Sequence, residues 1–173
     1  MMYYHRGSKP TKSLINNIKT RLTDISAQTI NDHLNKNKTK LIFLSKLKEE
    51  YKREKYLKIE NVENRRAITK LRTSAHNLLI ETGRWENIDR KSRICRHCYK
   101  QEIEDEEHFL FYCDMYAQTR STTFQSIKEL RTTDLLNTND KIHHLKELFN
   151  SDNLNAINSL GKFIKNSFKA RQT

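Results

Sequence analysis

The chain has 173 residues, with 33 Lys and Arg against 21 Asp and Glu, so its formal net charge is +12. Only 3 Gly and 1 Pro are present, too few turn-forming residues for a many-stranded sheet, and this favours helices. The 3 Cys argue against a secreted disulfide framework, and no apolar run approaches the ~20 residues of a membrane span. The start has no apolar signal segment, so we expect an intracellular protein, nuclear or cytoplasmic, without membrane contact.

Residues 1–60 are predicted to form a basic, helical N-terminal extension. After a loose basic arm over residues 1–10, apolar side chains recur at helical spacing from Thr11 to about Asn35, where a polar stretch ends the pattern. A second helical pattern follows it. The two apolar rows are Leu14, Ile18, Leu22 and Ile25, then Leu44, Leu47, Tyr51 and Leu57.

Residues 61–130 are predicted to hold a helical unit followed by a metal-binding segment. Asn61 is a suitable N-cap for the helix, with Asn64 as a second candidate. Gly83 suits the end of this unit. The apolar stripe between them is Ile68, Leu71, Ala75 and Leu78 or Leu79.

The remaining segments alternate in charge and then return to helical spacing. Residues 84–100 are basic and irregular, whereas residues 101–107 are acidic. A helix is predicted from Tyr116 through Ile127, and two more in a C-terminal unit, residues 131–173, around 142–149 and 154–168. The expected fold is mainly α, an irregular assembly of helices.

Four candidate metal ligands follow the pattern Cys-x2-Cys-x9-His-x4-Cys. A Cys-x-x-Cys turn brings two sulfurs to one cation, and a His and a third Cys complete a Cys3His set, which is usual for structural zinc. Soft thiolates favour Zn²⁺ over Mg²⁺ or Ca²⁺, and four protein ligands leave no position for a catalytic water. We therefore predict one structural zinc ion in a CCHC zinc knuckle, around which the irregular helical assembly forms. Its ligands are Cys95, Cys98, His108 and Cys113.

The spacing between the last two ligands predicts a break in the chain. On a regular helix His108 and Cys113 would be about 140° out of phase. We therefore expect a short helical turn over 104–110, a bend at Cys113 and a new helix from Asp114, with residues 109–112 packed around the knuckle. His97 is a rival ligand, but it lies between the two knuckle cysteines, where its side chain should point away from the metal.

The region 65–120 resembles the zinc-binding segment at the C-terminal end of non-LTR retrotransposon reverse transcriptases. The resemblance rests on residues 72–84, 93–98 and 103–110, together with Cys113, Tyr116 and Arg120. It implies that all four family ligands are present, on the four positions named above. Asp114 stands where the family often has Pro, but either residue can open a helix. The resemblance also implies the polymerase part of such a retroelement protein as a partner.

The catalytic residues of that family's enzymes are missing from this chain. A polymerase needs paired aspartates for two-metal chemistry, and no Asp-Asp pair occurs. Some members carry a nuclease with a Pro-Asp motif, but the one proline, Pro10, precedes Thr11. We therefore expect a non-catalytic module, not an enzyme.

The strong positive charge favours nucleic acid, DNA or RNA, bound through backbone phosphates. The acidic residues 102–107 should lie away from the binding surface. We expect His76 and Trp85 to pack structurally. The alternative function is a zinc-stabilised protein-interaction module without nucleic-acid binding. The predicted contacts are Arg84, Arg90, Lys91, Arg93 and Arg96 in the irregular stretch, extended by Arg65, Arg66, Lys70 and Arg72 on the preceding helix.

Overall fold

A computed structural model describes residues 11–36, 40–48, 52–131, 134–135 and 137–171. Within these ranges the chain forms seven α-helices and a single isolated β-bridge, so the predicted mainly α fold is confirmed. The basic arm predicted over residues 1–10 lies outside the described residues. The helices are α1 (Lys12–Lys36), α2 (Ile42–Leu47), α3 (Val62–Arg72), α4 (Leu79–Trp85), α5 (Ala117–Arg131), α6 (Lys141–Asn150) and α7 (Leu154–Ala170).

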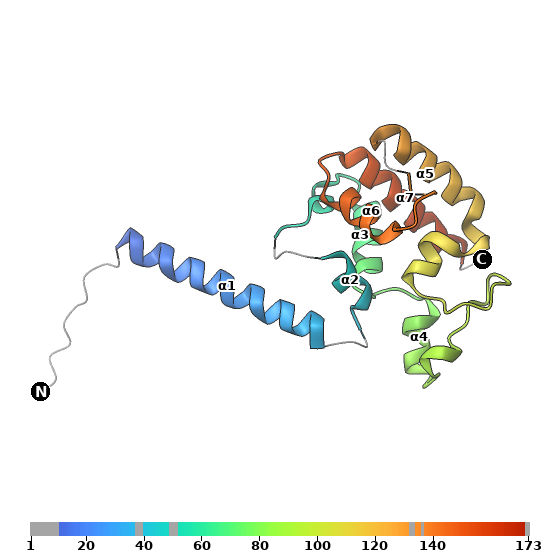
Figure 1. Ribbon diagram of the computed structural model, residues 1–173, viewed down its shortest axis with the longest axis horizontal. Helices are drawn as coiled ribbons and strands as arrows, with labels where there is room; N and C mark the ends of the chain where they lie inside the picture. Colours follow the sequence, from blue (N-terminus) through green and yellow to red (C-terminus); the bar gives the residue numbers. More distant parts are fainter. Residues whose placement is uncertain (1–10, 37–39, 49–51, 132–133, 136, 172–173) are drawn as a thin grey trace, which may run out of the picture.

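The core forms where α7 packs against α3 and α5 (Figure 1). The apolar stripe of α7 is fully buried at Ile157, Leu160 and Ile164, which explains why the C-terminal helix is predictable from its spacing. Side-chain caps fix where the two main helices begin. The side chain of Asn61 accepts a hydrogen bond from the Asn64 N–H at 3.0 Å, as predicted, and the side chain of Asn153 accepts one from the Ala156 N–H at 3.1 Å.

Gly161 permits the close approach of α7 to α3. A Cβ atom at this position would lie 2.9 Å from the carbonyl oxygen of Asn64, a backbone atom that cannot easily move aside. Asn64 is itself buried and donates through its side-chain amide to Asn158 at 2.8 Å. The glycine therefore sets the distance between the two helices.

The unit predicted over residues 61–83 is two helices and not one. α3 ends at Arg72, because Ser74 adopts a left-handed backbone with φ of 53° and the chain turns before α4. Ala75 is consequently exposed instead of belonging to an apolar stripe. Gly83 lies within α4 and not at its end. A Cβ there would meet the side chain of Arg93 at 3.0 Å, so the glycine makes room for that arginine.

The second predicted N-terminal helix is much shorter than its pattern suggested. α2 has only 6 residues, and a 3-10 turn (Lys55–Lys58) follows it, while Tyr51 lies outside the described residues. Phe43, Leu47 and Tyr56 are buried in the same core as α3 and α7. Side chains from before residue 60 and from after residue 130 therefore belong to the same buried cluster as those between them.

The helix α1 extends away from the other helices (Figure 1). Its predicted span is confirmed, but its apolar row is exposed, with Leu14, Leu22 and Ile25 at 49%, 59% and 52% of their accessible area. In the part of the chain that the structure describes, no helix combines the length and the apolar character needed to cross a membrane.

We predict that Gly161→Ala destabilises the protein by about 1–3 kcal/mol, because the added methyl group overpacks the α3–α7 contact. Chemical denaturation measures the change in the free energy of unfolding. The matched control is Asn166→Ala, an exposed position on the same helix. Equal stability of the two variants would contradict a close contact at Gly161.

Candidate metal centre

Four side chains from residues 95–113 converge at the edge of the core. The Sγ atoms of Cys95 and Cys113 lie 3.9 Å apart, and Cys98 Sγ lies 3.3 Å from His108 Nε2. All four ligand atoms lie within 4.8 Å of one another. A tetrahedral site with Zn–S bonds of ~2.3 Å has S–S edges of ~3.8 Å. The predicted group is thus assembled, with spacings that suit one tetrahedral metal ion.

A short antiparallel loop positions the first two sulfurs. Ile94 and Ile103 form the β-bridge, and the Cys95 N–H donates to the carbonyl oxygen of Glu102 at 2.8 Å. Inside the turn, the His97 N–H donates to Cys95 Sγ at 3.4 Å. A backbone donor of this kind stabilises a thiolate. The local backbone therefore holds the knuckle in the shape that a metal ion requires.

A π turn lets the last two predicted ligands, His108 and Cys113, face the same point. Residues His108–Tyr112 adopt π geometry, and the Cys113 N–H closes the turn by donating to the His108 carbonyl oxygen at 2.8 Å. This wider turn brings both ligands to one side, as π bulges often do at functional sites. The predicted bend at Cys113 is present, with extended backbone before a 3-10 turn at Asp114–Tyr116 and α5.

The aromatic cluster predicted around the knuckle is present in part. Phe109 and Phe111 are buried together with Leu110, and the Phe109 ring lies 4.6 Å from that of Phe168 on α7. Tyr112 instead remains 40% exposed, because the π turn directs it away from the core. The metal group is thereby anchored to α7 by apolar packing.

His108 is held in the orientation that ligation requires, and His97 is not part of the group. Nδ1 of His108 lies 2.8 Å from a carboxylate oxygen of Glu102. A proton on Nδ1 satisfies this bond and leaves the lone pair of Nε2 facing Cys98. His97 Nε2 instead lies 3.9 Å from Glu104. The ligand choice predicted from the sequence agrees with this geometry.

One buried carboxylate connects the candidate metal centre to two helices. Glu104 is 3% exposed, and its Oε1 lies 3.7 Å from Cys95 Sγ. Its Oε2 accepts from the Leu79 N–H at 2.7 Å, at the start of α4. Arg171, after α7, pairs with both carboxylate oxygens. The position of Cys95 is therefore tied to both helices.

Burial raises the pKa of the Cys95 and Cys113 thiols above that of a free cysteine. Without a cation both thiols therefore stay protonated at neutral pH, and a metal ion must displace those protons. Protons and metal compete for the same sulfurs, so metal affinity falls as the pH is lowered. On the far side of Cys113, Arg120 donates to its carbonyl oxygen at 2.9 Å and fixes the backbone there.

Three of the predicted nucleic-acid contacts are occupied inside the fold. Arg72 is 2% exposed, pairs with Glu54 at 3.1 Å and lies over the Tyr56 ring. The prediction that Arg72 contacts nucleic acid is therefore wrong, because its side chain is buried. Arg93 donates to the Ile80 carbonyl oxygen at 2.7 Å. Arg65 donates to a carbonyl oxygen at 2.8 Å in the preceding turn and is half-buried. The ion pair with Glu54 explains Arg72, and hydrogen bonds to backbone carbonyl oxygens explain Arg65 and Arg93, without a ligand.

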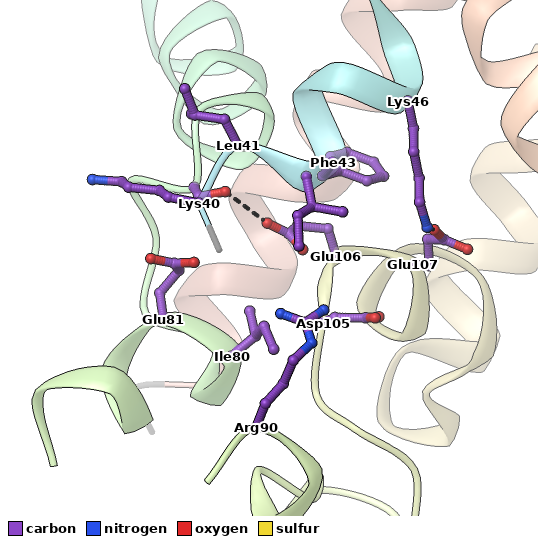
Figure 2. A pocket seen from close by; sticks show the side chains of 12 residues that line it. Lys40, Leu41, Phe43, Lys46, Ile80, Glu81, Arg90, Asp105, Glu106 and Glu107 are labelled. Carbon is purple, nitrogen blue, oxygen red and sulfur yellow. Dashed lines mark hydrogen bonds and ion pairs between the residues drawn. The ribbon is translucent and has the colours of Figure 1, made fainter. Parts of the chain in front are cut away.

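The acidic run lies against the predicted basic stretch, which corrects the expectation that it points away. Figure 2 shows a pocket into which the exposed Arg90 points, with Asp105 beside it, and Glu81 lines the same pocket. Lys91 lines another hollow together with Glu102 and Asp105. Such neighbours weaken the attraction of both cations for phosphate.

The other predicted contacts fall into two groups. Arg84 lies 3.4 Å from Glu81, whereas Arg96 and Arg66 are exposed.

Two aromatic side chains near the knuckle are exposed. Trp85 is 82% exposed, so the expectation that it packs on the knuckle is wrong, and Tyr99 is 98% exposed. Tyr99 was not among the residues predicted from the sequence, although its position next to Cys98 is a signal for it.

His76 is packed structurally, as expected. Its Nε2 lies 3.0 Å from Glu106, and its ring stacks near Phe168. Although burial by itself raises the pKa of Glu106, the hydrogen bond and charge of His76 bring that pKa below its ordinary value. The pair joins the segment before α4 to the acidic run.

The chain matches no protein-family model, no curated protein and no solved structure.

We predict that His108→Ala loses the bound metal, whereas His97→Ala retains one ion per chain. Metal-binding free energy at small structural sites is on the order of 10 kcal/mol and is largely folding free energy, so loss of a ligand should also disorder residues 93–116. Native mass spectrometry and circular dichroism measure the two effects. Retention by His108→Ala with loss by His97→Ala would show that the ligand assignment is wrong.

Proposed function

We propose that the metal ion is zinc and that its role is structural. Three sulfurs and one imidazole are donors that favour zinc over the hard cations. Four protein ligands fill a tetrahedron, so the ion has no position for a reacting water. Three of the ligands are buried, and only Cys98 is partly exposed. The zinc then replaces the apolar core that the segment between α4 and Phe109 lacks.

We propose that the chain is a non-catalytic module that binds nucleic acid at the zinc-held knuckle. The observation that carries this proposal is the composition of the knuckle's tip. Arg96 is exposed, with no ion-pair partner among the described residues, and Tyr99 projects into solvent. Arg96 offers a cation for phosphate, and Tyr99, three residues later, offers an exposed ring on which a base can stack. The zinc would hold the backbone that carries both residues, which lowers the entropic cost of binding.

The resemblance over residues 65–120 supports the same proposal. Its four ligand positions coincide with the four side chains that gather around one point. In the family that this region resembles, the zinc-binding segment follows a polymerase. We therefore propose the polymerase part of a retroelement protein as a further partner, with DNA or RNA as the ligand of this module.

One observation favours the alternative, a zinc-stabilised protein-interaction module. The apolar row on α1 is exposed in the described structure, and exposed apolar rows often mark interaction surfaces. A protein-interaction module needs no affinity for nucleic acid. Salt-dependent binding to generic DNA or RNA therefore separates the two functions.

We predict that the double variant Arg96→Glu, Tyr99→Ala binds short DNA and RNA oligonucleotides roughly tenfold more weakly or worse, since stacking on one aromatic residue contributes about 1–3 kcal/mol. Fluorescence anisotropy at several salt concentrations measures the dissociation constant. The control, Arg53→Glu with Leu57→Ala, makes the same charge change and removes another exposed apolar side chain. If the wild-type protein binds neither nucleic acid at low salt, the proposal fails and the alternative is favoured.

A further inference from the structure

A groove between α3 and α7 carries a different set of basic residues. It has a volume of about 420 Å³, and its rim includes Arg66 and Lys70 from α3 and Lys165 from α7. The apolar part of its lining comes from Ala67, Ala75 and Phe168. This volume lies within the range of roughly 300–1,000 Å³ that is typical of ligand sites. The groove is thus large enough for one nucleotide-sized group.

The groove is more positive than the hollows around Arg90 and Lys91. Its one acidic lining residue in the described part of the chain is Glu63, which pairs with Arg66 at 3.1 Å. Lys70 and Lys165 have no ion-pair partner among the described residues. The α7 sequence adds Lys162 and Lys169 without any acidic residue. Two free cations therefore face one groove from opposite helices.

The lining of the groove is rigid as well as apolar. The Phe168 ring stacks on the buried Phe109 at 4.6 Å, and His76 beside it is fixed by its bond to Glu106. The helices that form the two sides are held close together at Gly161. A binding surface whose shape is already fixed loses little entropy when it is occupied.

We propose that the α3–α7 groove holds one strand of single-stranded nucleic acid. Backbone phosphates lie on Lys70 and Lys165, and an unpaired base lies against Ala75 and Phe168. A duplex can offer phosphates to the rim, but its bases are stacked and paired and do not enter a groove of this kind. This inference rests on the proposed function and assigns to it both a second surface and a preference for single strands.

The test compares three variants for binding to a labelled 20-nucleotide oligo(dT) and to a duplex of the same length. Lys70→Glu with Lys165→Glu should weaken oligo(dT) binding by roughly tenfold or more and lower the salt slope by roughly 1.4, the value for two single-strand contacts. Lys19→Glu with Arg21→Glu on the exposed α1 makes the same charge change and should have a much smaller effect. Ala75→Leu should fill the groove and weaken oligo(dT) binding without changing the salt slope.

Circular dichroism checks that each variant is folded, and Lys70→Gln with Lys165→Gln provides a milder version of the charge change. If the wild-type chain binds no nucleic acid, this inference falls together with the proposed function. If the double variant Arg96→Glu, Tyr99→Ala weakens binding but the groove variants bind like the wild type, only the proposal of a binding site in the groove is refuted. Equal affinity for duplex, or equally effective competition by poly-glutamate, would also refute a single-strand site.

Discussion

Glu104 is the residue on which the arrangement of the metal segment depends. A buried carboxylate is costly unless each of its oxygens is satisfied. Here the Leu79 N–H, Arg171 and the nearby Cys95 sulfur surround it. Arg171 in turn donates to the Asn77 carbonyl oxygen at 3.3 Å, beside the α3–α7 groove. One charge pair thus links the knuckle, the start of α4, the end of α7 and the groove.

The segment between α4 and α5 needs this link because it has little regular structure of its own. Residues 86–116 contain short 3-10 and π turns and one β-bridge, and they bury few side chains before Phe109. The proposed metal ion, held by four ligands, would replace the missing apolar contacts, as in small zinc domains. The helices α3, α5 and α7 have their own apolar stripes, so they should fold without it.

The features that the sequence predicted are those encoded locally. Helical spacing located α5, α6 and α7, and ligand spacing located the four side chains that converge in a group able to hold a metal ion. The break after Arg72 was missed because it depends on the left-handed conformation of Ser74, which no pattern signals. The internal roles of Arg72 and Arg93 were missed because their partners, Glu54 and the Ile80 carbonyl oxygen, meet them only in the folded chain. The exposure of Trp85 was missed because the burial of a single side chain is decided only in the folded chain.

The most direct test of the account is hydrogen exchange of the amide groups with zinc bound and after its removal by a chelator. We expect that removal of zinc abolishes protection at Cys95, Glu104 and Cys113, whose amides bond within the metal segment, and at Leu79, which donates to Glu104. Amides in the buried middle of α7, around Leu160, should keep their protection. Unchanged exchange at Cys95 and Cys113 after zinc removal would contradict a structural metal centre.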